Sequence, residues 1–157
     1  MPSDLFADTR VGWLELKTPK GETVQLEPDF YYAHIAIQIG NRWLHAHPQR
    51  GVEVVSREKL ENFGKIKEVW ASDDEDSSYL NKIDFYVGRS FDNQFSWSDE
   101  KIYCAELVAK LLQINPTPMH FDLDFWNQWY QQFEGKPGSS PSKIYQALRE
   151  LNYYRME

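Results

Sequence analysis

The segment 31–47 constrains the fold of this chain more than any other part of the sequence. Residues 31–39 (YYAHIAIQI) alternate in a way that predicts a β-strand with three isoleucines on one face, because successive side chains of a strand point to opposite sides. Gly40-Asn41 is a turn signal, and residues 42–47 (RWLHAH) predict the return strand. The sequence therefore indicates a hairpin whose other face carries His34, Ala36 and Gln38.

The earlier part of the chain favours strands and the later part favours helices. Further strands are expected in a hairpin over residues 10–26, over 51–55, over 65–71, and as a strand or short buried segment over 83–87. Residues 57–64 are compatible with a helix or a turn. Helices are expected over 99–113, 120–133 and 143–151, with an acidic loop at 73–78. Strands followed by helices favour an α+β fold over a wound α/β sheet.

Length and composition narrow the class of protein. The 157 residues fit one domain, which we expect to span residues 1–157. The formal net charge of −7 opposes binding to phosphate backbones, so we expect no nucleic-acid partner. The sequence has no apolar run of the roughly 18–20 residues that a transmembrane helix requires, and no secretory signal is visible. These features favour a cytoplasmic protein, although a trimmed form of an exported protein would look the same.

The single cysteine, Cys104, lies in the first two turns of the predicted helix over 99–113, on its apolar face. Amides at a helix N-terminus carry partial positive charge, which lowers the pKa of a nearby thiol and can stabilise an oxyanion. This placement favours a nucleophile. A lone cysteine on an apolar helix face is also typical of a buried small hydrophobic residue.

His34 is the candidate base for this thiol. It shares its strand face with the small Ala36, so we expect this face to receive the helix that bears Cys104. A two-residue turn at Gly40-Asn41 would place His47 opposite His34 and His45 opposite Ala36. Either of these histidines is compatible with orienting the base.

Three histidines on one face are also compatible with a zinc site. Clear carboxylate or thiolate ligands are lacking beside them, because Glu53 and Asp84 are distant in the sequence. We therefore expect no metal and no cofactor.

Several short motifs, in the right order, resemble those of the YaeF/YiiX group of permuted papain-like (NlpC-type) cysteine hydrolases. The "HvgIyiG…viHA…GV" pattern of those proteins is matched by residues 34–40 (HIAIQIG), 43–46 (WLHA) and 51–52 (GV). Their "YDf…YCsELv" block and "sPsdI" segment are matched by residues 83–85 (IDF), 103–108 (YCAELV) and 140–144 (SPSKI). The matches run from about residue 32 to 148. Relatives often open with a "GDl" segment and a signal peptide, whereas this sequence has Ser3-Asp4-Leu5 and no visible signal.

This resemblance implies a circularly permuted papain-like fold, in which an antiparallel sheet packs against the helix that bears the nucleophile. It assigns Cys104 as nucleophile, His34 as base and His45 as the third catalytic residue, because His45 stands just before the Ala of the "HA" pair. It implies hydrolysis of an amide or ester bond through a Cys104 thioester. The expected substrate is a small molecule, a peptide or a lipid.

Two other functions are compatible with the same sequence. In an acyltransferase acting on a lipid, as in the related lecithin:retinol acyltransferase group, another acceptor takes the place of water. A binding module of the same fold would keep the triad geometry without turnover. An aromatic segment is compatible with an acyl or peptide groove, or with core or lid packing: Phe121, Phe125, Trp126, Trp129 and Tyr130.

Overall fold

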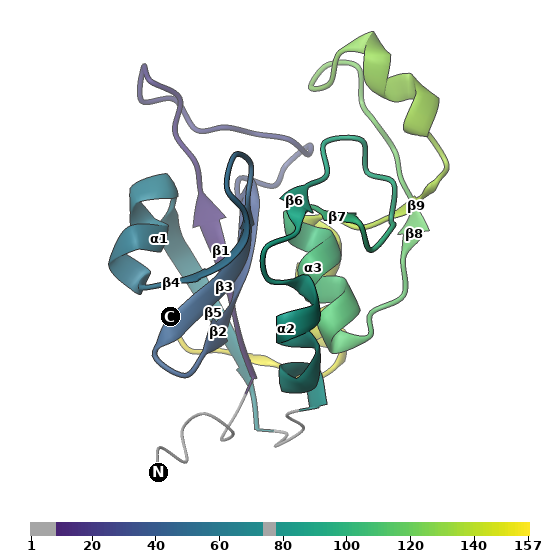
Figure 1. Cartoon of the computed structure of the whole chain (residues 1–157). Helices are drawn as coiled ribbons and strands as arrows, with labels where there is room; N and C mark the ends of the chain where they lie inside the picture. Colours follow the sequence, from purple (N-terminus) through teal and green to yellow (C-terminus); the bar gives the residue numbers. More distant parts are fainter. Residues whose placement is uncertain (1–8, 74–77) are drawn as a thin grey trace.

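A six-stranded sheet forms the centre of the protein (Figure 1), which is seen here in a computed structural model that describes residues 9–73 and 78–157. The strand order is β10-β5-β1-β2-β3-β4, and every neighbouring pair is antiparallel. The bounds are β1 Thr9–Glu15, β2 His34–Ile39, β3 Arg42–His47, β4 Gly51–Val55, β5 Lys65–Ser72 and β10 Tyr154–Arg155. The expectation of an α+β fold with an antiparallel sheet is therefore confirmed.

Short helices and strand pairs surround the sheet (Figure 1). The helices are α1 Arg57–Phe63, α2 Ile83–Tyr86, α3 Cys104–Leu112 and α4 Pro141–Glu150, with 3-10 segments η2 Ser78–Lys82 and η3 Gln128–Phe133. The small strand pairs are β6 Ser90–Phe91 with β7 Lys101–Ile102, and β8 Thr117–Pro118 with β9 Pro137–Gly138. Within residues 9–73 and 78–157, none of the helices combines the length and apolar character needed to cross a bilayer.

The central hairpin has the register that the sequence predicts. Gln38 pairs with Trp43 and Ile39 pairs with Arg42, so Gly40-Asn41 forms the two-residue turn. Gly40 has φ of 60°, a left-handed conformation that suits this hairpin turn. Extending the register places Ala36 opposite His45, on the face away from the isoleucines.

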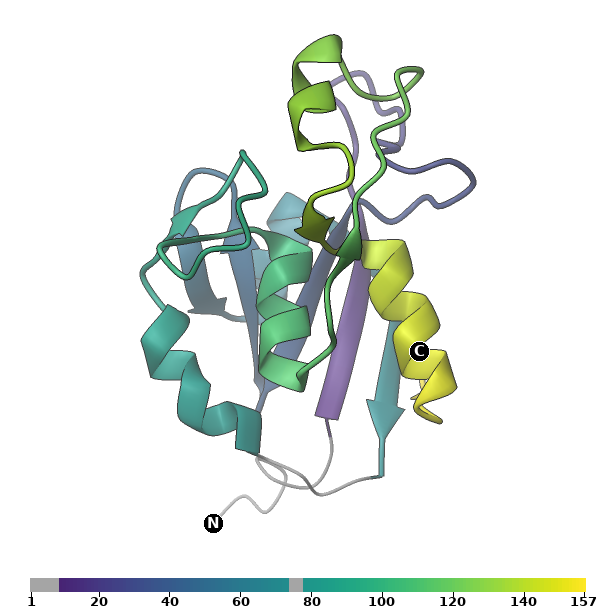
Figure 2. The same cartoon turned by 90° about the vertical axis from the view of Figure 1, so that its right-hand side faces the viewer.

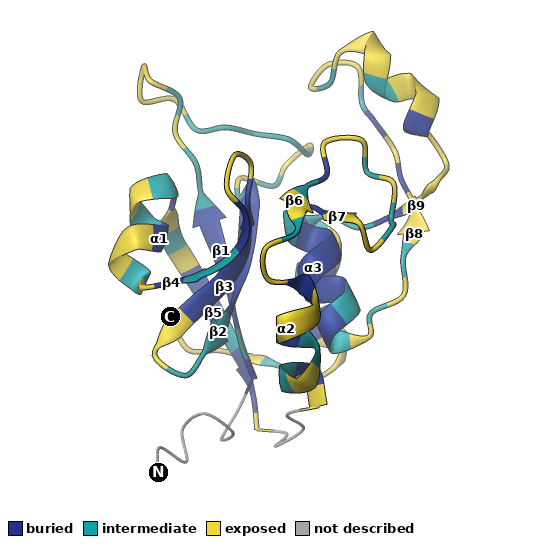
Figure 3. Ribbon diagram, viewed as in Figure 1, coloured by how far each residue is buried: buried dark blue, intermediate teal, exposed yellow. Residues whose placement is uncertain are grey.

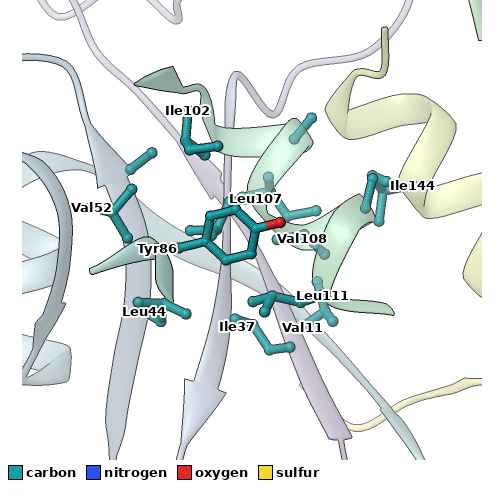
Figure 4. Close-up of a cluster of buried hydrophobic side chains, with 14 of the residues drawn as sticks. Val11, Ile37, Leu44, Val52, Tyr86, Ile102, Leu107, Val108, Leu111 and Ile144 are labelled. Atoms are coloured by element: carbon teal, nitrogen blue, oxygen red, sulfur yellow. The ribbon is translucent and has the colours of Figure 1, made fainter. Parts of the chain in front are cut away.

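Different helices cover the two faces of the sheet. Figure 1 places α1 on one side and α2 and α3 on the other, and Figure 2 shows α4 beside α3. On the isoleucine face, Ile35 and Ile37 pack in one buried cluster with residues of α3 and α4, part of which is drawn in Figure 4. On the opposite face, Ala36 packs in a second cluster with Leu60 of α1. The expectation that the helix bearing Cys104 covers the face of His34 is therefore wrong.

Helix α3 begins five residues later than the predicted start at Asp99. Residues 101–102 pair in parallel with residues 90–91 as a short strand instead. The Glu106 carboxylate accepts a hydrogen bond from the backbone N–H of Tyr103, the N-cap, at 3.2 Å, which satisfies a free amide at the helix start. Cys104 is consequently the first residue of the helix. Most of α3 is buried, as Figure 3 shows.

Other predicted elements differ in part. The hairpin over 10–26 is confirmed only around its turn, where Lys17 and Thr23 form an isolated antiparallel bridge. Strand β1 itself is a central strand, and it pairs with β2 and β5. The segment over 83–87 is a short helix. The helix over 120–133 is reduced to η3, because the Asp122 and Asn127 side chains accept backbone N–H groups that an α-helix would use.

Four further elements agree with the sequence. The strands over 51–55 and 65–71, the helical option for 57–64 and the helix over 143–151 are confirmed. The acidic loop at 73–78 includes residues 74–77, and the Ser3-Asp4-Leu5 segment lies within residues 1–8; both stretches are outside the described residues.

Candidate active site

Cys104 and His34 line one cavity of about 460 Å³, at the end of the sheet where α3 begins and β2 begins. They come from opposite sides of the sheet, but each stands at the first residue of its element. The cavity wall is largely apolar and includes Leu16, Leu26, Phe63, Phe95, Met119, Phe121, Trp126 and Tyr130. Both residues of the expected nucleophile–base pair therefore open onto the same space.

The thiol of Cys104 is half-buried. The backbone amides of Ala105, Ile35 and Cys104 itself interact with the sulfur and favour the thiolate. Burial outweighs these amides and raises the pKa of the Cys104 thiol to about 12. The expectation that the helix start lowers this pKa is therefore not met. Within the described residues, no hydrogen bond joins the Cys104 thiol to the His34 ring.

A chain of hydrogen bonds runs from His34 across three neighbouring strands. His34 Nε2 lies 2.9 Å from His45 Nδ1, and His45 Nε2 lies 2.8 Å from Glu53 Oε2. Arg50 donates to both oxygens of Glu53, each at 2.8 Å. The three members stand on β2, β3 and β4, where His45 and Glu53 are cross-strand partners. The sheet register thus holds the imidazole of His34 through two further side chains.

The protonation of this chain follows from burial and charge. His34 is 3% exposed, and burial holds its pKa well below 6.5, with the nearby His45 and His47 acting in the same direction. Burial also lowers the pKa of His45, although the Glu53 carboxylate acts to raise it. The hydrogen bonds from Arg50 help to lower the pKa of Glu53 to about 2. At neutral pH both histidines are therefore neutral and Glu53 is ionised.

His47 has a different role from His45. Its Nδ1 accepts hydrogen bonds from the backbone N–H groups of Gln49 and Arg50, both at 3.1 Å, and so stabilises the turn between β3 and β4. The structure places His45, and not His47, in hydrogen-bond contact with His34. The extended register puts His47 opposite His34, but long side chains on diagonal positions of a twisted sheet also meet.

Phe63, the last residue of α1, covers the histidines. Its ring centroid lies 4.8 Å from that of His34, 4.9 Å from that of His47 and 6.0 Å from that of His45. This aromatic cover removes water from the imidazole of His34 and contributes to the burial that lowers its pKa.

The histidine cluster does not form a metal centre in the described part of the chain. Among those residues, no group of three or more His, Cys, Asp or Glu side chains is arranged to hold a metal ion. The physical reason is that the nitrogens are directed at other partners. His34 Nε2 and His45 Nδ1 face each other, and His47 Nδ1 accepts two amides. These residues do not fit the tetrahedral donor set of a zinc site.

Two segments close the outer part of the cavity. The indole N–H of Trp126 donates to the carbonyl of Leu26 at 2.8 Å, which joins the loop before β2 to the arm that contains η3. The Glu27 carboxylate accepts from the backbone N–H of Ser142 at 3.1 Å and also contacts the Ser142 hydroxyl. Of the aromatic segment, Phe121, Trp126 and Tyr130 line the cavity, whereas Phe125 and Trp129 are exposed.

The member of this hydrogen-bonded chain that the sequence alone did not indicate is Glu53. Eight positions separate it from His45 in the chain, so the sequence offers no direct reason to join the two. The signal was present in the pairing of β3 with β4, since a short turn between these strands brings Glu53 opposite His45.

Comparisons with known proteins show a likeness in fold. No protein-family model matches the chain, and no curated protein matches it. Among solved structures, the chain is similar to yiiX from Escherichia coli O157:H7, which is described as a metalloprotein and as DUF1105. The TM-score is 0.67 at 16% sequence identity, and the match covers 98% of this chain and 97% of that chain. The chain therefore has a yiiX-like fold over nearly its whole length.

Proposed function

We propose that this protein is a cysteine hydrolase of the permuted papain-like type, with Cys104 as nucleophile and His34 as base. One observation carries the proposal. Cys104, the first residue of α3, shares a cavity with His34, and the Nε2 atom of His34 lies 2.9 Å from Nδ1 of His45. The base precedes the nucleophile in the chain, as expected for the permuted order.

The proposed reaction starts from a neutral thiol and a neutral imidazole. Burial disfavours both charged forms, so the proton leaves Cys104 as its sulfur attacks the carbonyl carbon, and His34 takes that proton. The backbone N–H of Cys104 at the helix start can stabilise the oxyanion. His34 then returns the proton to the leaving amine or alcohol, which leaves a Cys104 thioester. Water attacks this thioester with His34 again as base. The carbon–sulfur bond then breaks, the carboxylic acid leaves, and His34 returns the proton to the Cys104 sulfur.

The cavity favours substrates with an apolar group beside the scissile bond. Phe95, Phe121 and Trp126 are among the apolar side chains that line it, and they exclude water from the reacting groups. A charged group in that position would lose its hydration without gaining a partner. Transfer of the acyl group to an acceptor other than water would use the same thioester.

A second candidate function is a binding module of the same fold. The raised pKa of Cys104, and the lack of a hydrogen bond between its thiol and His34 in the described residues, favour this alternative. In that case the cavity would hold a ligand without turnover.

The acyl-enzyme distinguishes the two functions. The protein would be incubated with p-nitrophenyl esters and anilides whose acyl groups differ in length and charge, and intact mass spectrometry would follow the adduct. We expect a Cys104 adduct and product release with apolar acyl groups, and neither in Cys104→Ala. Because the chain has one cysteine, an adduct that is absent from Cys104→Ala is assigned to that thiol. Equal turnover in wild type and Cys104→Ala would contradict the proposal.

A further inference from the structure

Glu53 is held as an ionised acceptor next to His45. Its side chain is 17% exposed, and Arg50 donates to both carboxylate oxygens at 2.8 Å. An ionised carboxylate has no proton to donate. The contact of 2.8 Å between Glu53 Oε2 and His45 Nε2 therefore requires that the proton lies on His45 Nε2.

This assignment passes along the chain to the base. A neutral imidazole carries one proton, so His45 Nδ1 has a free lone pair and accepts. The nitrogen that faces it at 2.9 Å, His34 Nε2, must then donate. A neutral His34 that is protonated on Nε2 has an unprotonated Nδ1. That nitrogen is the ring atom that can take a proton from a thiol.

The opposite arrangement would block the base. If His45 carried its proton on Nδ1, it would donate to His34 Nε2, and neutral His34 would be protonated on Nδ1. The carboxylate of Glu53 would then face the bare Nε2 of His45, with two acceptors in contact at 2.8 Å. Glu53 thus disfavours the tautomer pair in which His34 cannot act.

We propose that Glu53 is a positioning residue, which fixes the tautomers of His45 and His34 through two successive hydrogen bonds and so leaves His34 Nδ1 free as the base. This inference rests on the proposed function, in which His34 accepts the proton of Cys104. Arg50 supports it by holding both oxygens of Glu53 in place.

The nitrogen shifts of the histidine rings test the inference directly. In ¹⁵N-labelled wild-type protein at neutral pH, we expect both His34 and His45 to be protonated on Nε2, as read from two-bond ¹H–¹⁵N spectra. In Glu53→Leu we expect a mixture of tautomers and a rate of Cys104 acylation that is roughly 10- to 100-fold lower, the equivalent of one charge-assisted hydrogen bond. Glu15→Leu is a matched control, since Glu15 is also a strand carboxylate with a side chain 20% exposed.

Two results would overturn the inference. One is the finding that His45 of the wild-type protein carries its proton on Nδ1. This measurement uses the wild-type protein alone, so it does not depend on whether a variant folds. The other is a Glu53→Leu protein whose tautomers and acylation rate equal those of wild type. The proposed function fails on a separate result. If the tautomers depend on Glu53 but the protein forms no Cys104 acyl adduct, the hydrolase proposal is refuted while the positioning of the rings is supported.

Discussion

Replacing Phe63 with alanine should raise the pKa of His34 and move the acid limit of the reaction. The Phe63 ring lies 4.8 Å from the His34 ring and is part of the cavity wall. Burial is the largest cause of the low pKa of His34, so water admitted by Phe63→Ala should raise this pKa towards 6.5. Each pH unit of that rise corresponds to roughly 1.4 kcal/mol between the two protonation states of His34.

The same change should lower stability at neutral pH. Replacing a fully buried phenylalanine with alanine lowers the free energy of unfolding by about 3–5 kcal/mol. Because Phe63 is half-buried, we expect roughly half of that loss. The pH dependence has a definite sign. Because the folded pKa of His34 lies below 6.5, the unfolded chain binds the proton first as the pH falls. Wild type therefore loses stability below pH 6.5, and this contribution should be smaller in Phe63→Ala.

The assay is the pH profile of Cys104 acylation between pH 4.5 and 8, together with an NMR titration of the His34 ring. Phe63→Leu is the control, because it keeps an apolar cover over the histidines. We expect the acid limb to move up in Phe63→Ala and to stay near wild type in Phe63→Leu. An unchanged His34 pKa in Phe63→Ala would refute the view that the aromatic cover sets it.

Three further expectations concern the site and the sheet. His45→Ala should lower turnover by roughly 10- to 1000-fold, while His47→Ala should change it little, as steady-state rates of the two variants will show. Gly51→Ala should lower the free energy of unfolding by about 2–3 kcal/mol in urea titrations, because Gly51 has φ of 82° and an added Cβ would lie 2.3 Å from the carbonyl oxygen of Arg89. Alkylation of Cys104 by iodoacetamide should accelerate by about tenfold per pH unit from pH 6 to 9, since its thiol pKa is raised, and a plateau already reached at pH 6 would indicate a preformed thiolate.

The hairpin of β2 and β3 could be predicted from the sequence because its signals are local. Alternation assigns each side chain to a face, and Gly40-Asn41 sets the register, so these two patterns are enough to bring His34 and His45 to the same face of neighbouring strands. The neighbours of β1 could not be predicted in the same way. Val11 of β1 pairs with Trp70 of β5, and a contact between segments so far apart leaves no local pattern.

The start of α3 and the partner of His45 depend on tertiary structure. Apolar periodicity marks the helix but not its first residue, which is decided by the carboxylate of Glu106 and by the pairing of residues 101–102 with 90–91. Periodicity also shows which side chains share a face, but not which helix covers that face. The position of Glu53 required the pairing of β3 with β4.

The hydrogen bond between the indole of Trp126 and the carbonyl of Leu26 has a consequence for the rate of the proposed reaction. The indole N–H and this one backbone carbonyl join two loop segments across the cavity wall, whereas the histidines stand on paired strands. Breaking such a hydrogen bond costs about 1 kcal/mol, far less than disrupting the sheet. We therefore expect these loops to open more readily than the sheet. Entry and product release should respond to changes in these loops that leave the acid–base geometry intact.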